Sequence, residues 1–534
     1  MKKLIAVLLL TSAGLQAQTP SVRQLRTVPE RTEFRETSRY DDVVTFMRAI
    51  DAASPRIHLT TFGYTVEGRA LPLAVVGDVP NASPEAVKAS GKLRVYIQGN
   101  IHGGEVEGKE SAQHLLRAIA GGAHPEWMKT MVLLVAPIYN ADGNERVALT
   151  NRGLQHGPVG GMGQRPNAQE FDLNRDHMKQ ESPEARSVAK LLTDYDPHAA
   201  IDLHTTNGTR HAYHLTYSPP LNPNTDPGII GMLRGEWFPY VTKQVRAKHG
   251  WEYFYYGNAG QPDASGQRAW RTFEHVPRFN NNYIGLRNRF ALLSEAYSYL
   301  TFEDRIKATT YFLEEALGFA STNAAKIMKT VAAADAASIV GQKQSVRSRH
   351  HKGGDVDILM GDVEELRHPY TGQMMLLRKD VVKPEKMADY STFESSMDET
   401  APAEYYIPAN LLANAAQNTR LLATLTDKLS AHGIRFTRLT APQTVRAEQF
   451  AITANAQAEQ PFQNHRMRTL DGKWNEAADI TLPAGSLAVP VNQPLGKIVF
   501  YLLEPRSDDG WSTWNLLDQL LGADAKAYPI VRRR

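Results

Sequence analysis

The chain has 534 residues, of which 42% are hydrophobic and 22% charged, and its formal net charge is +3. This composition is typical of a globular protein, and the length exceeds what one ordinary core accommodates, so we expect at least two domains. The net charge falls to +1 once Lys2 and Lys3 are removed by processing, which gives no electrostatic reason to expect nucleic acid or an acidic membrane surface as a partner.

The first residues resemble a secretory signal. A basic start at Lys2 and Lys3 precedes the apolar run Leu4–Leu10, and small residues lead to a cleavage site expected after Ala17, so residues 1–17 are predicted to be a signal peptide. This run is too short to span a membrane, and no other stretch approaches the ~20 apolar residues required. The chain has no cysteine, which excludes disulfides, a cysteine nucleophile and thiolate metal sites. We therefore expect a periplasmic or secreted bacterial protein, in which any metal is held by His, Asp or Glu.

Several secondary-structure elements are predicted in the first hundred residues after this segment. Residues 41–52 favour a helix, and 56–64 and 70–76 favour two strands around the turn 67–69. The alternating apolar run 93–97 then predicts a buried strand.

A strand-to-helix turn follows this run and carries the first candidate metal ligands. After His102-Gly103-Gly104-Glu105, an apolar stripe from Val106 to Ile119 has helical spacing. Ligands of α/β sheets commonly bind at such turns. An imidazole and a carboxylate three residues apart can bind one Zn²⁺ ion, although this pattern is weak evidence alone.

The next elements lead to a third candidate ligand. Residues 131–136 predict a buried strand, 139–143 a turn, and 151–170 a long loop of the kind that is functional or disordered. A helix is expected to begin at Ser182-Pro183-Glu184. The strand-like run 199–203 ends at His204.

The following region is predicted to enclose the substrate. Residues 208–283 are irregular, aromatic and proline-rich, which suits the wall of a binding site. The apolar strand 290–295 ends on Glu295, which is either a solvated strand end or a general base on the same sheet edge as His102 and His204. A helix is expected from 303 to 329.

Alternating strands and helices predict an α/β fold with a mixed, mostly parallel sheet flanked by helices and a site outside the carboxyl ends of the strands. The Ala-rich stretch 320–338 and the basic run 347–352 mark a boundary. We expect one domain at 18–335 and a smaller β-rich domain of unknown role at 336–534.

The C-terminal half shows no legible chemistry. His350 and His351 are interpreted as solvated linker residues, because no carboxylate is placed beside them. A helix is predicted at 410–432, and 488–490 and 499–503 are typical strand pieces. Trp511 and Trp514 could form a binding platform, but core packing is the more frequent outcome for such a pair.

The first 320 or so residues resemble the zinc carboxypeptidase family, the carboxypeptidase A-like metallopeptidases. The export signal and the extra C-terminal domain resemble an exported bacterial branch of this family. The resemblance rests on six motifs: Glu67-Gly68-Arg69, HGGE at 102–105, the asparagine-containing turn 139–143, DLNRD at 172–176, DLHT at 202–205 and SEAYSY at 294–299. Each motif is weak alone, but together and in this order they are specific.

The resemblance implies a hydrolytic metal centre. One Zn²⁺ per chain would be held by His102, Glu105 and His204, with water in the open fourth position. Glu295 corresponds to the general base, which takes a proton from that water and returns it to the leaving nitrogen.

The DLNRD motif carries three further roles by resemblance. Asn174 and Arg175 correspond to the pair that grips the terminal carboxylate of the substrate, for which the planar fork of arginine is suited. Asp172 corresponds to the carboxylate that orients a ligand histidine. The alternatives are that Asp172 caps a turn and that Arg175 forms a surface ion pair.

Two further assignments are ambiguous. The arginine that stabilises the oxyanion matches either Arg152 or Arg165, and we prefer Arg165 because it lies nearer the DLNR segment, taken as a strand. Tyr283, 12 residues before Glu295, is the candidate for the tyrosine that covers the substrate, with an aromatic wall residue as an equal interpretation.

The leading hypothesis is an exported zinc metallocarboxypeptidase that acts on peptides. A zinc-dependent amidase or deacylase acting on N-acyl amino acids or cell-wall peptides is the alternative, and a non-catalytic binding protein is a third hypothesis. The specificity, the physiological substrate and the oligomeric state are left open by the sequence.

Overall fold

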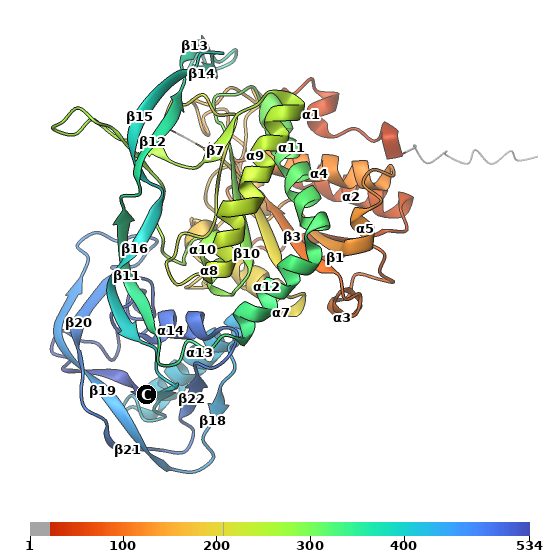
Figure 1. The fold of residues 1–534 in the computed structure, drawn as a ribbon. Helices are drawn as coiled ribbons and strands as arrows, with labels where there is room; N and C mark the ends of the chain where they lie inside the picture. The colour runs from red at the N-terminus through yellow and green to blue at the C-terminus, as the bar shows by residue number, and fades with distance from the viewer. Residues whose placement is uncertain (1–21, 207) are drawn as a thin grey trace, which may run out of the picture.

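The computed structural model describes residues 22–206 and 208–534 and has an α/β part and a β-rich part (Figure 1). The α/β part holds a central sheet with helices on both faces, and the β-rich part, coloured teal to blue, packs along one side of it. The predicted signal peptide, residues 1–17, lies outside the described residues. Within the described ranges, no helix is long and apolar enough to cross a membrane.

The central sheet has eight strands in the order β1-β2-β4-β3-β5-β10-β6-β7. Four of its neighbouring pairs are parallel: β3 with β4, β3 with β5, β5 with β10, and β6 with β7. This confirms the predicted mixed, mostly parallel sheet. The strands are β1 (Ile57–Tyr64), β2 (Ala70–Val76), β3 (Leu93–Gly99), β4 (Met131–Ala136), β5 (Ala199–Thr205), β6 (Leu215–Ser218), β7 (Tyr253–Tyr255) and β10 (Phe290–Ala296).

The four central strands are apolar and buried on both faces, as parallel strands covered by helices must be. One face packs against α2 (Tyr40–Ala53), α4 (Glu107–Ala120), α9 (Phe238–His249), α11 (Phe302–Thr322) and α12 (Ala324–Ala336). The other face packs against α7 (Pro183–Asp194) and α10 (Asn280–Leu286). This second core continues without interruption into the C-terminal region through α13 (Ala415–His432) and α14 (Gly496–Leu503). The smaller helices of the α/β part are α1 (Val28–Arg31), α3 (Pro84–Ala89) and α5 (Trp127–Thr130).

The prediction that residues 208–283 are irregular is wrong over much of its length. Helix α8 (Pro227–Met232), a π-helical turn (Leu233–Trp237) and α9 form one continuous helical stretch. Pro227 occupies the first turn of α8 behind the capping Asp226, where proline is tolerated. Glycines and a second proline inside the stretch conceal its periodicity in the sequence.

Three other elements differ from expectation. Residues 139–143 contain a short helix, α6 (Ala141–Glu145), capped by Asn140. The helix expected at 303–329 is two helices, α11 and α12, separated at Asn323. Residues 499–503 belong to α14 rather than to a strand. The prediction failed because a short apolar run that is buried on all sides has the same sequence pattern in a helix and in a strand.

The C-terminal region is β-rich, as predicted. Its strands are β11 (Lys343–His351), β12 (Gly354–Met360), β13 (Val363–Arg367), β14 (Met374–Arg378), β15 (Lys383–Tyr390), β16 (Thr392–Thr400), β17 (Glu404–Ile407), β18 (Thr437–Arg438), β19 (Gln443–Gln457), β20 (Arg468–Trp474), β21 (Ala478–Leu482), β22 (Leu487–Pro490) and β23 (Ala527–Arg533). The predicted helix 410–432 begins at Ala415 behind Asn414 and ends at Gly433, whose φ of 80° suits a glycine cap. The boundary at 335/336 remains a prediction. The hairpin β8 (Asn258–Ala259) and β9 (Ala269–Arg271) extends the β12–β15 sheet across it.

The interpretation of His350 and His351 is corrected, whereas the core packing favoured for Trp511 and Trp514 is confirmed. His350 and His351 are not in a solvated linker but in β11, where the His350 ring lies 4.2 Å from that of Phe393 and His351 pairs with Glu394 at 3.2 Å. Trp511 and Trp514 are buried, so they pack in the core and do not form a platform.

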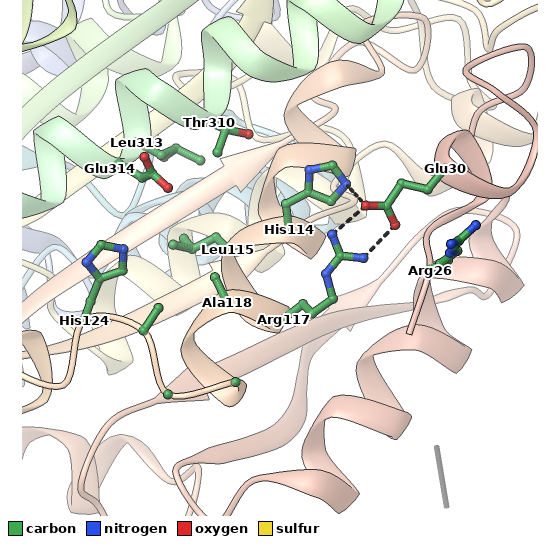
Figure 2. A pocket seen from close by; sticks show the side chains of 13 residues that line it. Arg26, Glu30, His114, Leu115, Arg117, Ala118, His124, Thr310, Leu313 and Glu314 are labelled. Carbon is green, nitrogen blue, oxygen red and sulfur yellow. Dashed lines mark hydrogen bonds and ion pairs between the residues drawn. The ribbon is translucent and has the colours of Figure 1, made fainter. Parts of the chain in front are cut away.

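A cavity of about 820 Å³ lies between α4, α11 and the N-terminal segment (Figure 2). On its wall, Glu30 binds Arg117 at 2.6 Å and lies 3.4 Å from His114. Helix α4 begins beside His102 and Glu105 and runs away from them, so the cavity lies towards its far end. None of the residues predicted to bind metal or substrate lines it.

Replacement of Arg532 tests how strongly the C-terminal core depends on a buried ion-pair cluster. The Arg532 side chain is fully buried and lies within 2.8 Å of both Glu448 and Glu504. We expect Arg532→Met to lower the free energy of unfolding by about 3–5 kcal/mol, because it leaves buried carboxylates without a counter-charge.

The matched control is Arg533→Met, because Arg533 is half exposed and pairs with Glu404 at 3.0 Å. An exposed pair contributes about 0–1 kcal/mol. Denaturant unfolding of both variants measures the difference, and equal losses would contradict the expectation.

Candidate metal centre and active site

The predicted site residues come together at the carboxyl end of the central sheet. His102 and Glu105 follow β3, His204 lies near the end of β5, and Glu295 lies near the end of β10. Glu295 is directly opposite His204 in the parallel pair of β5 and β10. Because β3, β5 and β10 are parallel neighbours in the sheet, residues that are far apart in the sequence lie at the same edge of the sheet.

The HGGE turn is held by its own backbone. Asn100 adopts a φ of 64°, and its side-chain amide donates to the carbonyls of His102, Gly103 and Glu105 at 3.2–3.3 Å. A side chain at Gly103 would collide with the backbone of α6 and of Gln164, and one at Gly104 with the backbone of Gly163. The two glycines are therefore needed for the close approach of this turn to those segments.

His102, Glu105 and His204 form a buried metal-binding group. Their ligand atoms lie within 4.8 Å of one another, and the Nδ1 atom of each histidine is 2.9 Å from a different oxygen of Glu105. Burial raises the pKa of Glu105, but the charges of His102 and Arg152 outweigh it and hold this pKa well below its usual range, so the carboxylate is ionised.

The opposite ring nitrogens of the two histidines are fixed by carboxylates. His102 Nε2 lies 3.1 Å from Asp172 Oδ1, and His204 Nε2 lies 2.9 Å from Asp202 Oδ2. A carboxylate that accepts the Nε2 proton leaves the Nδ1 lone pair free for a metal. This donor set of two imidazoles and one carboxylate fits Zn²⁺.

The Asp202 contact was missed by sequence reasoning, although the residue stands inside the DLHT motif. Its carboxylate also accepts from Gln98 at 3.1 Å and from Asn280 at 2.8 Å. The sequence signal that could have identified Asp202 is its spacing of two residues from His204, which places both side chains on the same face of β5.

The segment that carries Asp172, Asn174 and Arg175 is a single 3-10 turn at Leu173–Arg175, so its interpretation as a strand is wrong. Asp172 Oδ1 accepts from the Asn174 backbone nitrogen at 2.9 Å as well as contacting His102. The turn-capping and histidine-orienting interpretations of Asp172 are therefore compatible.

A cavity of about 330 Å³ opens above these residues. Its wall is formed by His102, Glu105, Arg165, Asn174, Arg175, His204, Thr205, Thr206, Tyr256, Phe273, Phe279, Asn281, Leu293 and Glu295. Arg175 stacks at 3.7 Å on the Phe279 ring, and its side chain is only 19% exposed. It is therefore held inside the cavity rather than in a surface ion pair.

Both candidate arginines for the oxyanion lie close to Glu105. Arg152 Nη1 is 3.1 Å from Glu105 Oε1 and its side chain is 13% exposed. Arg165 is 3.7 Å from the same oxygen, pairs with Asp172 at 2.8 Å and is 40% exposed. Arg165 lines the cavity, and this position suits a group that meets a substrate.

Glu295 lies on the cavity wall, and its pKa is raised above the usual value for glutamate. Burial raises its pKa to about 8, the negative charge of Glu105 adds to the rise, and the charges of His204 and Arg152 oppose it. A carboxyl group with a raised pKa is suited to accepting a proton near neutral pH.

The assignment of Tyr283 is corrected. Its ring is fully buried in α10, and its hydroxyl lies 2.8 Å from His432 and 3.2 Å from Arg287, so it neither covers nor lines the cavity. Tyr256 lines the cavity instead. Burial raises the Tyr256 pKa, and so does the charge of Glu295. Tyr256 stands in an aromatic run, Trp251–Tyr256, in which no spacing identifies the functional member.

Comparisons with known proteins agree with this metal centre. Residues 43–226 match the family model described as zinc carboxypeptidase. Carboxypeptidase 2 of Trichophyton equinum is 24% identical over 97% of this chain and 91% of its own length, and that of Trichophyton rubrum is 24% identical over 91% and 85%. These relatives are fungal, so the bacterial origin remains a prediction.

Among solved structures, a metallo-carboxypeptidase from Burkholderia cenocepacia is 17% identical, with a TM-score of 0.40 over 54% of this chain and 70% of its own. Carboxypeptidase A from Helicoverpa armigera is 13% identical, with a TM-score of 0.41 over 57% and 78%. Residues 43–226, which match the zinc carboxypeptidase family model, include the buried His–Glu–His group, so this part of the chain is similar to zinc carboxypeptidases.

Proposed function

We propose that this protein is an exported zinc metallocarboxypeptidase that releases the C-terminal residue of peptides, with Glu295 as general base. One observation carries the proposal. A buried His–Glu–His group, a proton-accepting carboxylate and a guanidinium that can bind a carboxylate share one cavity. Export rests on the signal pattern at residues 1–17.

His102, Glu105 and His204 would hold the metal. Bound Zn²⁺ supplies Lewis acidity and lowers the pKa of a water molecule towards ~7. Asp172 and Asp202 keep both imidazoles in the tautomer that presents Nδ1.

Asn174 and Arg175 would grip the terminal carboxylate of the peptide. The guanidinium of Arg175 is planar and can donate two parallel hydrogen bonds to a carboxylate. Its stacking on Phe279 and its bond to the Asn174 carbonyl at 2.8 Å fix the plane before substrate arrives. Little side-chain conformational entropy of Arg175 is therefore lost when substrate binds.

Glu295 would take the proton of the attacking water and deliver it to the leaving nitrogen. Arg165 would stabilise the negative charge that develops on the carbonyl oxygen, because a cation held in a partly desolvated cavity acts strongly on such a charge. Tyr256, on the same wall, would contact the bound residue.

The metal is tested with His102→Ala and with chelation. We expect about one zinc per wild-type chain by elemental analysis, and loss of both zinc and amino acid release in the variant, because one of three ligands is removed. Chelation should abolish release from a mixed peptide pool, and added zinc should restore it.

His351→Ala is the matched histidine control, because His351 of β11 pairs with Glu394 of β16 and does not line the cavity. It should retain zinc and activity. Wild-type protein without metal would contradict the proposal, whereas zinc-dependent cleavage of N-acyl amino acids but not of peptides would favour the amidase alternative.

The general base is tested with Glu295→Gln, which preserves shape but cannot accept the proton. We expect kcat to fall by about 10²–10⁴ while the zinc content stays near one per chain, measured by steady-state kinetics and elemental analysis. Near wild-type kcat in the zinc-loaded variant would exclude Glu295 as the base.

The carboxylate grip is tested with Arg175→Lys, which keeps the charge and loses the fork. We expect KM for a short peptide to rise about tenfold or more with a smaller change in kcat. The matched substrate is the same peptide with a C-terminal amide. Wild-type protein should bind it poorly, and the substitution should have little further effect on it. An equal loss for both substrates would show that Arg175 does not recognise the carboxylate.

A further inference from the structure

The C-terminal region contacts the segment that carries the substrate-binding residues. This segment, residues 172–181, is called the anchor segment here because it holds Asp172, Asn174 and Arg175. Gln463 Oε1 accepts from the Asp172 backbone nitrogen at 2.9 Å, and His465 Nε2 lies 2.9 Å from Glu181 Oε1. Both ends of the anchor segment are therefore bound by the loop between β19 and β20.

Helix α13 binds the same segment from another side. Lys428 Nζ donates to the carbonyls of Lys179 and Gln180 at 2.6 and 3.0 Å, and Gln180 Nε2 lies 2.8 Å from His432 Nδ1. Lys428, Gln180 and His432 are buried, whereas Gln463, His465 and Glu181 are partly exposed. The buried contacts fix the backbone of the anchor segment more firmly than solvated ones would, because breaking them leaves polar groups without water.

Gln463 stands in a tight turn with an unusual backbone. Phe462 and His465 exchange two backbone hydrogen bonds, at 2.8 and 3.0 Å, around Gln463 and Asn464. The φ angles of the two central residues are 49° and 64°. Turns of this kind favour glycine, asparagine or aspartate at both positions, so glutamine is not explained by the turn itself. Its side-chain contact with Asp172 supplies an explanation.

We propose that Gln463 is a positioning residue of the active site, through which the C-terminal region holds Asp172 in place. Asp172 Oδ1 contacts His102 Nε2 at 3.1 Å and accepts from the Asn174 backbone nitrogen at 2.9 Å. A fixed Asp172 backbone therefore sets the orientation of one metal ligand and the position of the turn that presents Arg175. In this proposal the C-terminal region supports the active site directly, through the contact of Gln463 with Asp172.

The proposal is tested with side chains of equal length. Gln463→Met removes the hydrogen-bond acceptor, whereas Gln463→Glu keeps an acceptor oxygen at the same distance from the backbone. Because both substitutions are made at position 463, any cost of a non-glycine residue at its positive φ is the same in the two variants. Asn464→Gly is the control for the turn, because Asn464 is exposed and its φ suits glycine. Thermal unfolding verifies that each variant is folded.

The first measurement is zinc affinity, determined by competition of the folded protein with a chelator, because loss of support for a ligand histidine weakens metal binding. We expect the zinc dissociation constant to rise several-fold in Gln463→Met and to stay within about twofold of wild type in Gln463→Glu and Asn464→Gly. The second measurement is peptide hydrolysis, in which kcat/KM of Gln463→Met should fall about tenfold, mainly through KM.

Wild-type zinc affinity and kinetics in Gln463→Met would overturn the proposal. An equal loss in Gln463→Glu would do so too, because it would assign the effect to the turn rather than to the acceptor. The kinetic readout rests on the proposed function, but the zinc readout does not. A wild-type protein that binds zinc and hydrolyses no peptide would refute the function while the zinc affinities still decide the role of Gln463.

Discussion

The charge balance beneath the cavity is the constraint on which the active site depends. Glu105 is nearly inaccessible to water, as are Asp172 and Asp202, and each carboxylate contacts at least one imidazole nitrogen of His102 or His204. Buried negative charges are tolerated only when they are paired and hydrogen-bonded. Arg165 and Arg152 supply part of the compensation, and a divalent cation would supply the rest.

This arrangement also separates the roles of two neighbouring carboxyl groups. Glu105 contacts both histidines and is held in its ionised form. Glu295 lies in the same cavity, but burial and the charge of Glu105 raise its pKa to about 8, so it can both take up and release a proton near neutral pH. Two carboxyl groups in one cavity can perform different tasks because their surroundings move their pKa values in opposite directions.

The sequence predicts those parts of the site that strand ends determine. His102, His204 and Glu295 each follow an apolar run, and parallel strands bring such positions to one edge. Tyr256 and Gln463 could not be found in this way. Tyr256 stands among other aromatic residues without a period, and the contact of Gln463 with Asp172 spans 291 residues of sequence. The fold shows the same division, because the regular strands were predicted, whereas α14 and the helical stretch 227–249 lack a legible pattern.

The distance in sequence between the two halves of the site has a consequence for the timing of activity. The candidate metal ligands and the proposed general base lie within the first 295 residues of the chain, but the second core of the sheet is completed by α13 and α14. The ribosome makes the chain from its N-terminus, so the anchor segment gains its contacts with Gln463 and His465 only after those residues have been synthesised. Assembly of the proposed peptide-cleaving centre is delayed until then.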